Sequence, residues 1–268
     1  MLRDGICQKD RPIPMPRLAD SHVHLDDARF APDREAAIER AHRAGLELLV
    51  VPGTTAASWP HIHALCSPGS GLFPGYGLHP MFMREHRDDD LHALPHWLEN
   101  HRPVAVGEIG LDFHQEGQDT QRQRDYFERQ LRLAREFDLP VILHARAAMD
   151  EVTTTLRRTG GLRGVVHSFS GSEEQARQLW KIGFHIGIGG PVTYERAQRL
   201  RRIVASMPIQ YLLLESDAPD QPGAAHRGER NEPSYLPDVL TCVAALRNED
   251  PEQIAEATTA NVRRLFNI

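Results

Sequence analysis

The sequence predicts a single (β/α)8 barrel, the TIM-barrel class of α/β fold. Three observations support this prediction. The chain has 268 residues, close to the typical length of such a barrel. Eight short apolar runs follow one another along the chain, and patterns long enough for helices separate them. This alternation indicates a parallel sheet with right-handed crossovers, and eight units close such a sheet into a barrel.

The eight expected strands share one pattern, a short apolar or β-branched run that ends in polar residues. An open doubly wound sheet is the competing fold. No Gly-x-Gly-x-x-Gly follows the first run, however, and "GIGG" at 187–190 lacks the rest of that dinucleotide-binding pattern. The expected strands cover residues 17–22, 46–53, 72–80, 103–110, 139–146, 163–171, 184–190 and 209–219.

Amphipathic segments separate the runs. One covers residues 31–45 and ends at a glycine, a common helix stop. The longest covers residues 120–138, where aromatic and aliphatic side chains recur at helical spacing. The segment at 251–268 is expected to close the chain against the barrel. No repeat or linker marks a second domain, so we expect one domain over residues 17–268 after an N-terminal tail of residues 1–16.

Composition narrows the class of protein. No apolar run approaches the roughly 18 residues that a membrane span needs, and the opening residues lack the apolar stretch of a signal peptide. We therefore expect a cytoplasmic monomer without a membrane partner. The net charge of −6 argues against a broad basic surface for nucleic acid, so any such contact must be local. Cys7, Cys66 and Cys242 are too far apart to indicate a disulfide framework or a zinc ribbon.

The stretch "DSHVHLD" at 20–26 places two histidines two residues apart at the end of the first run. Side chains alternate along a strand, so His22 and His24 point the same way and can share a metal ion. Such a pair also occurs on solvated strand faces. Further ligands must therefore come from elsewhere in the chain.

Other ionisable residues also lie at the ends of the expected strands. In a barrel of this class, functional groups collect at the C-terminal ends of the strands. Each one taken alone is more often a hydrogen-bonded core or rim residue than a ligand. Together they favour a cation, because buried ionisable groups are costly unless they are paired or bound to metal. The residues at these ends are His22, His24, His79, Glu108, His144, His167, Glu215 and Asp217.

Six of these side chains are suitable metal ligands. This number is larger than one tetrahedral zinc ion uses, and it suits two cations with a bridging carboxylate. Glu108 is the expected bridge. A carbamylated lysine is the alternative bridge, but the only lysines, Lys9 and Lys181, lie away from the strand ends. The expected ligands are His22, His24, Glu108, His144, His167 and Asp217.

Seven blocks of the sequence resemble the TatD family of metal-dependent deoxyribonucleases, and within it the YjjV-like branch. They are "DSHVHLD", "YGLHP", "VAVGEIGLD", "PVILHAR", "VVHSFSG", "IGIGG" and "LLLESDAP", in family order. The resemblance implies a barrel of the metallo-dependent hydrolase type and activity supported by magnesium. It also implies one metal on His22, His24, Glu108 and Asp217, a second on Glu108, His144 and His167, and orienting roles for Asp112 and Glu215.

We expect Glu108 and Asp217 to be catalytic, with Asp217 helping to accept the proton of a water that the two metals activate. His79, Arg227 and Arg230 are candidates for contacts to substrate phosphate, since arginine suits bidentate phosphate recognition. The alternatives are rim packing for His79 and, for the arginines, a surface loop whose Asn231 or Ser234 caps the next helix.

The expected cofactors are two divalent ions, Mg²⁺, Zn²⁺ or Mn²⁺, since imidazole-rich sites favour zinc or manganese while the resemblance implies magnesium. The resemblance implies a 3'-to-5' DNA exonuclease, which we expect to act on DNA ends or short nucleotides. A small-molecule amidohydrolase or lactonase on the same barrel is one alternative. A non-catalytic metal-binding partner is another, but its ligand set would be broken, and here all six positions are filled.

Overall fold

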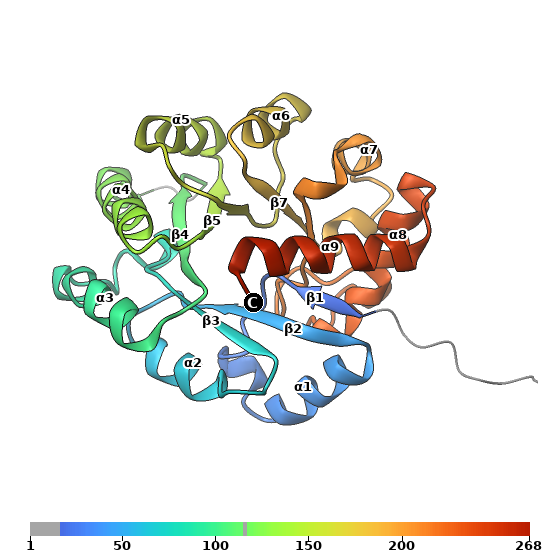
Figure 1. Cartoon of the computed structure of the whole chain (residues 1–268), viewed down its shortest axis with the longest axis horizontal. Helices are drawn as coiled ribbons and strands as arrows, with labels where there is room; N and C mark the ends of the chain where they lie inside the picture. The colour runs from blue at the N-terminus through green and yellow to red at the C-terminus, as the bar shows by residue number, and fades with distance from the viewer. Residues whose placement is uncertain (1–16, 115–116) are drawn as a thin grey trace, which may run out of the picture.

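Eight parallel strands lie side by side in sequence order, each hydrogen-bonded to the next (Figure 1). The first and last strands also meet, because the Ser21 N–H donates to the Leu214 carbonyl oxygen at 3.0 Å. The predicted barrel is confirmed. The computed structural model describes residues 17–114 and 117–268, so the predicted tail at 1–16 lies outside the described residues. The strands are β1 (Leu18–Asp20), β2 (Leu46–Pro52), β3 (Leu72–Tyr76), β4 (Ala105–Asp112), β5 (Val141–Arg146), β6 (Gly164–Val166), β7 (His185–Ile188) and β8 (Leu212–Leu214).

Two strands are much shorter than the sequence predicted. The run at 163–171 contributes only β6, and the run at 209–219 contributes only β8. Ser168 and Asp217, which follow these strands, have φ angles of +44° and +54°. A residue in this left-handed region ends an extended run. Neither run can therefore continue as a strand through these residues, and β6 and β8 end two and three residues before them.

Helices surround the strands and follow the amphipathic patterns of the sequence. The segment at 31–45 contains α1, and the segment at 120–138 contains α4, which buries Tyr126, Phe127 and Leu131. The helices are α1 (Arg34–Arg43), α2 (Trp59–Leu65), α3 (Asp88–His101), α4 (Thr120–Glu136), α5 (Met149–Thr159), α6 (Glu173–Lys181), α7 (Gln198–Ser206), α8 (Leu236–Arg247) and α9 (Pro251–Phe266).

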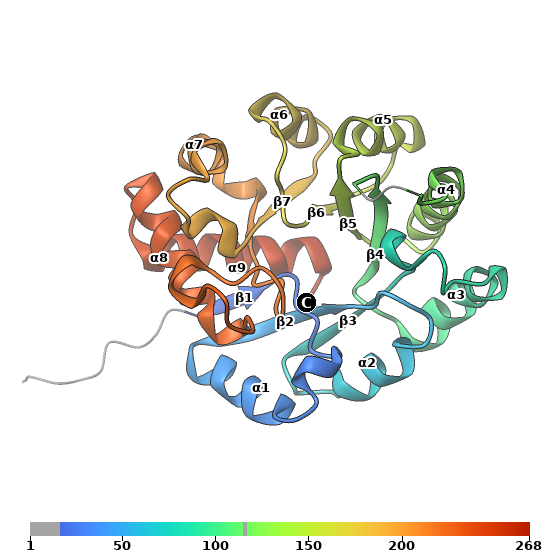
Figure 2. The same cartoon turned by 180° about the vertical axis from the view of Figure 1, so that it is seen from behind.

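Helix α9 lies across one end of the barrel, as expected for the closing segment (Figure 1). Its side chains Val262, Leu265 and Phe266 pack against apolar residues from the barrel interior, among them Ala19 and Leu213. The view from behind shows the opposite end of the strands in front of α9 (Figure 2). Apolar packing thus closes one end, and the polar strand ends gather at the other.

None of the helices in the described ranges is long and apolar enough to cross a membrane. Cys66 and Cys242 are free thiols, in agreement with their spacing in the sequence. Cys7 lies outside the described residues.

Candidate metal centre

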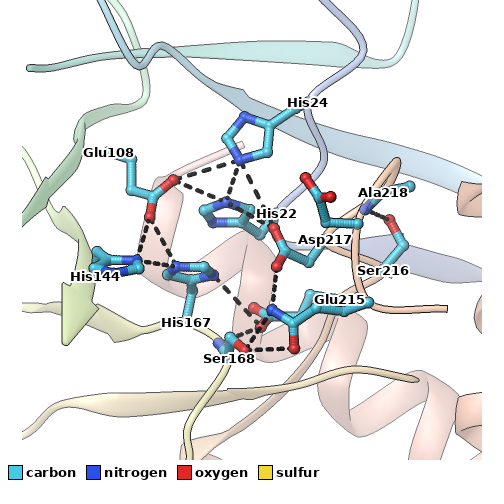
Figure 3. A network of polar contacts seen from close by, with 12 residues as sticks. His22, His24, Glu108, His144, His167, Ser168, Glu215, Ser216, Asp217 and Ala218 are labelled. Carbon is cyan, nitrogen blue, oxygen red and sulfur yellow. Dashed lines mark hydrogen bonds and ion pairs between the residues drawn. The ribbon is translucent and has the colours of Figure 1, made fainter. Parts of the chain in front are cut away.

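The six expected ligands converge at the open end of the barrel (Figure 3). His22 and His24 follow β1, His167 follows β6 and Asp217 follows β8. Glu108 and His144 lie within β4 and β5. Parallel strands in a closed barrel bring all their C-terminal ends to one face, which is why residues almost 200 positions apart in the sequence meet.

One group of ligand atoms forms around His22. Its Nε2 atom lies 3.0 Å from His24 Nε2 and 3.5 Å from Asp217 Oδ1. Glu108 Oε2 lies 3.2 Å from His22 Nε2 and 3.4 Å from His24 Nε2. Side chains from three strand ends therefore direct their ligand atoms to one place.

A second group forms around the other oxygen of Glu108. Oε1 lies 2.8 Å from His167 Nε2 and 3.2 Å from His144 Nδ1. These two nitrogens are 3.4 Å apart. Glu108 thus divides its oxygens between two groups of imidazoles, the arrangement needed for a carboxylate between two cations.

The two groups are less separate than the sequence suggested. The His22 ring stacks on the His167 ring, with centroids 3.9 Å apart. Three overlapping sets have ligand atoms within 4.8 Å of one another. They are His22 with Glu108 and His167, His22 with His24 and Asp217, and His79 with Glu108 and His144. Every expected ligand belongs to at least one set, and His79 joins them.

The donor set fits a divalent cation. Imidazole nitrogens and carboxylate oxygens are ligands of zinc and manganese. His22 is fully buried, and its Nε2 faces the Nε2 of His24 across 3.0 Å. Two nitrogen lone pairs at this distance repel each other unless a proton or a cation lies between them, and a buried polar atom without such compensation is costly.

Charge in the cluster centres on Glu108. Burial opposes ionisation of this carboxyl, but its interactions with the surrounding imidazoles, His167 foremost, outweigh burial and hold its pKa well below the usual range. Burial lowers the pKa of His24 and of His167, but Glu108 overcomes burial and raises these pKa values to about 9 and about 10. Glu108 is therefore the anion around which the imidazoles are organised.

His79 is held against Glu108. Its Nδ1 accepts the Met81 N–H at 3.1 Å, so the ring proton is on Nε2, which lies 2.8 Å from Glu108 Oε1. Burial lowers the pKa of His79 to about 4, and the ring is neutral at pH 7. Both nitrogens are thus engaged within the protein, and a contact between His79 and substrate phosphate stays a prediction.

Asp112 lies next to His144, and the orienting role that the family resemblance implies for it stays a prediction. Its Oδ2 accepts the Nε2–H of His144 at 2.9 Å, and its Oδ1 accepts the His114 N–H at 2.9 Å. This hydrogen bond fixes the proton of His144 on Nε2 and leaves Nδ1 free to face Glu108. A carboxylate that orients a ligating imidazole in this way is common at metal sites.

Glu215 supports the segment after β6. Its Oε1 accepts the Ser168 N–H and lies 3.9 Å from His167 Nδ1. Gly187 makes room for this carboxyl, since a Cβ atom there would lie 2.0 Å from Glu215 Oε2. Burial raises the pKa of Glu215 to about 8. Through its hydrogen bond with the Ser168 N–H, the Glu215 carboxyl holds the backbone next to His167.

Asp20 and Ser216 join β1 to β8, and sequence reasoning missed this pair. Asp20 Oδ1 accepts the N–H groups of His22 at 3.1 Å and of Ser216 at 2.9 Å. Its Oδ2 accepts the Ser216 hydroxyl at 2.6 Å. Asp20 thereby fixes the backbone beside His22 and beside Asp217. A carboxylate at the start of "DSHVHLD", inside an otherwise buried run, was the available signal.

Gln221 was also missed, and no pattern in the sequence marks it. Its Nε2 donates to Asp217 Oδ2 and to Ser168 Oγ at 2.7 Å. The hydrogen bond to Oδ2 orients the Asp217 carboxylate so that Oδ1 faces His22 and His24. Gln221 is thus a positioning residue for an expected ligand.

The two arginines of the loop after β8 differ sharply. Arg230 donates to Asp33 at 2.6 and 2.9 Å and to Glu232 at 2.7 Å, and its guanidinium lies over the Phe30 ring. Arg227 is exposed and has no hydrogen bond or ion pair to the described residues. The role of either arginine in phosphate binding stays a prediction, and Arg227 is the one with a free guanidinium.

The alternative reading of this loop as a helix cap is wrong. The residue before α8 is Tyr235, and no side chain caps that helix. Asn231 instead donates to the backbone oxygens of Ser216 and Asp220, both at 2.7 Å. The amide therefore fastens the loop beside Asp217.

Residues 19–267 match the family model described as "TatD related DNase". The chain belongs to the TatD family. The expected resemblance is therefore confirmed. Among its relatives, YjjV of Escherichia coli K12, named an uncharacterized metal-dependent hydrolase, is 41% identical over 94% of this chain and 98% of its own length. A protein of Citrobacter rodentium named "3'-5' ssDNA/RNA exonuclease TatD" is 35% identical over 93% of this chain and 97% of its own.

A solved structure supports the TatD-family barrel as well. The crystal structure of E. coli YjjV superposes with a TM-score of 0.91 at 39% identity, over 95% of this chain and 99% of that one. This chain is therefore similar to YjjV in both sequence and structure.

Proposed function

We propose that this chain is a metal-dependent phosphodiester hydrolase that removes nucleotides from the 3' end of DNA with two divalent cations. The observation that carries the proposal is the division of the two Glu108 oxygens between two groups of imidazoles. Phosphodiester hydrolysis needs an activated water and neutralised phosphoryl oxygens, and a pair of cations supplies both. A TatD relative whose name includes 3'-5' ssDNA/RNA exonuclease supports this reaction class.

His22, His24, Glu108 and Asp217 would hold one ion, and Glu108, His144 and His167 would hold the other. When bound, the ions lower the pKa of water and act as Lewis acids toward the phosphate. Magnesium, zinc and manganese are the candidates. The excess of imidazole ligands favours zinc or manganese.

Asp217 is the proposed proton acceptor. Burial raises its pKa above the usual range, although the charges of His167 and His24 oppose this. A buried carboxylate beside the proposed ions is placed to accept the proton of the attacking water. Because Gln221 occupies Oδ2, Oδ1 is the oxygen directed toward the centre. The other buried groups then hold the ligating imidazoles in place. They are Glu108, His79 and Asp112.

The test compares substrates, metals and chelation. Chelated protein is supplied with each metal in turn and given 5'-labelled single-stranded DNA, the matching RNA and a dihydroorotate-like ring amide. We expect a ladder of DNA shortened from the 3' end, and none with chelator present. Ring opening without phosphodiester cleavage would replace the proposal with an amidohydrolase activity.

Asp217→Asn tests the proton acceptor. We expect kcat to fall by about 10²- to 10⁴-fold, the usual contribution of a general base, with metal content measured by elemental analysis. Asp220→Asn is the matched control, because Asp220 lies three residues away, is exposed and pairs with Arg29. Unchanged turnover of Asp217→Asn at full metal occupancy would remove Asp217 from the chemistry.

Three further expectations remain proposals. We propose a cytoplasmic monomer whose residues 17–268 act as one domain. Gel filtration with light scattering tests the oligomeric state, cell fractionation tests the location, and limited proteolysis tests the domain.

A further inference from the structure

A cavity of about 410 Å³ opens beside the metal centre, between the loops that follow β6, β7 and β8. Apolar side chains form part of its wall, and polar and basic side chains form the rest. The residues that matter for its chemistry are Ser168, Phe169, Arg196, Arg199, Leu200 and Gln221.

The cavity shares two residues with the surroundings of the metal centre. Ser168 directly follows His167, and Gln221 donates one hydrogen bond to Asp217 and another to Ser168 Oγ. The wall of the cavity is therefore one hydrogen bond away from an expected metal ligand. A substrate group that extends from the centre past Gln221 enters this cavity.

The charge of the cavity is entirely positive. Among residues 17–114 and 117–268, Arg196 and Arg199 are the only charged residues that line it. Neither forms an ion pair with the described residues: the Arg196 guanidinium lies over the Tyr194 ring at 5.1 Å, and Arg199 donates to the Ser170 carbonyl at 2.7 Å. Two guanidinium groups without a carboxylate partner favour an anionic ligand, in a chain whose net charge is −6.

A neighbouring cavity of about 450 Å³ gives the contrast. It lies on the other side of residues 170–171 and includes Asp150 and Glu151 in its lining. Carboxylates repel a phosphate. The two cavities therefore differ in the charge of their lining residues, and the first suits an anion better than the second does.

We infer that the first cavity is a subsite for one nucleotide next to the scissile phosphodiester, an inference that rests on the proposed function. Its volume is near the lower end of the range for small-molecule sites, which suits one nucleotide rather than a longer strand. The apolar wall at Phe169 and Leu200 suits a base, and guanidinium planes bind phosphate or stack on bases. A one-nucleotide subsite selects chain ends and short substrates.

The experiment measures binding of dAMP and of uncharged deoxyadenosine to the full-length chain by calorimetry. Both metal-loaded and chelated protein are used. Leu200→Trp fills the cavity, and Arg196→Gln with Arg199→Gln removes its charge. Arg202→Gln is the matched control, because Arg202 is exposed, lies in α7 with Arg199 and Leu200, and does not line the cavity.

We expect dAMP to bind about tenfold more tightly than deoxyadenosine to the chelated chain, the equivalent of one charge-assisted hydrogen bond. The double arginine variant should lose about this tenfold preference, Leu200→Trp should lose binding of both probes, and Arg202→Gln should match the wild type. The double variant changes two exposed side chains, so it tests the subsite even if Leu200→Trp does not fold.

Three results would overturn the subsite: no dAMP binding to the wild type, an equal loss in Arg202→Gln, or full dAMP binding by folded Leu200→Trp. Other results distinguish failure of the subsite from failure of the proposed function. Specific dAMP binding without any chelator-sensitive DNA hydrolysis would support the subsite and overturn the nuclease activity. Hydrolysis without dAMP binding would overturn the subsite alone.

Discussion

His185 lies at the start of β7, where its environment keeps the imidazole neutral. Its Nδ1 lies 3.4 Å from the Gly164 carbonyl oxygen, to which it donates, and the residue is only 7% exposed. Burial lowers its pKa to about 4, since it outweighs the opposing effect of hydrogen bonds to the backbone of Gly164 and Gln210. In the unfolded chain, the pKa of His185 has its ordinary value of about 6.5. We therefore expect His185 to make the stability of the fold depend on pH.

The sign follows from proton binding. Between pH 6.5 and pH 4 the unfolded state binds a proton at His185 and the folded state does not, so acid favours unfolding. The contribution is fully present above pH 6.5 and is lost as the pH falls toward 4. Between pH 7 and pH 4.5 these two pKa values give a loss of about 2 kcal/mol in the free energy of unfolding.

The assay is urea unfolding of chelated protein at several pH values. His185→Gln should show a smaller loss between pH 7 and pH 4.5 than the wild type, by about 2 kcal/mol. His92→Gln is the control, since His92 is exposed on α3 and should leave the wild-type pH dependence intact. An identical pH dependence in His185→Gln and the wild type would refute the reasoning.

Further predictions concern the metal centre and its loops. Gly187→Ala should lower the free energy of unfolding by about 1–3 kcal/mol, measured in urea, because its Cβ would overlap Glu215; wild-type stability would contradict the packing. Asp112→Asn should weaken zinc binding about 10- to 100-fold by calorimetry, and unchanged affinity would show that Asp112 orients nothing. Arg230→Gln should cost about 1 kcal/mol of stability through its lost ion pairs and should raise KM for DNA less than Arg227→Gln does. Arg227→Gln should raise KM and leave stability unchanged, so equal effects of the two variants on KM would contradict this division.

Much of the fold could be predicted because its rules are local. Each strand is a short apolar run, and each helix repeats apolar residues at its own period. The convergence of His22, Glu108 and Asp217 was also predictable, since one topological rule places the C-terminal ends of all strands at one face. Strand ends were less predictable. The left-handed backbone at Ser168 and Asp217 depends on contacts that the local pattern does not contain.

The detailed pairing of side chains was beyond the sequence for a different reason. His22 stacks on His167, a residue that the family resemblance assigned to the other ion. Ring orientation depends on the rotamers of neighbouring side chains, and spacing carries no information about them. The same holds for Arg230, whose partner Asp33 lies almost 200 residues away. Buried hydrogen bonds between distant segments are fixed only once the fold has formed.

The Asp20 and Ser216 clamp has a consequence for biosynthesis. A chain emerging from the ribosome exposes His22 and His24 early, while Asp217 is made 195 positions after His22. Until β8 docks, Asp20 lacks its Ser216 partners and the barrel seam stays open. If these residues hold the proposed cations, we therefore expect the site to be completed late in synthesis, because an unfinished chain carries only part of the ligand set.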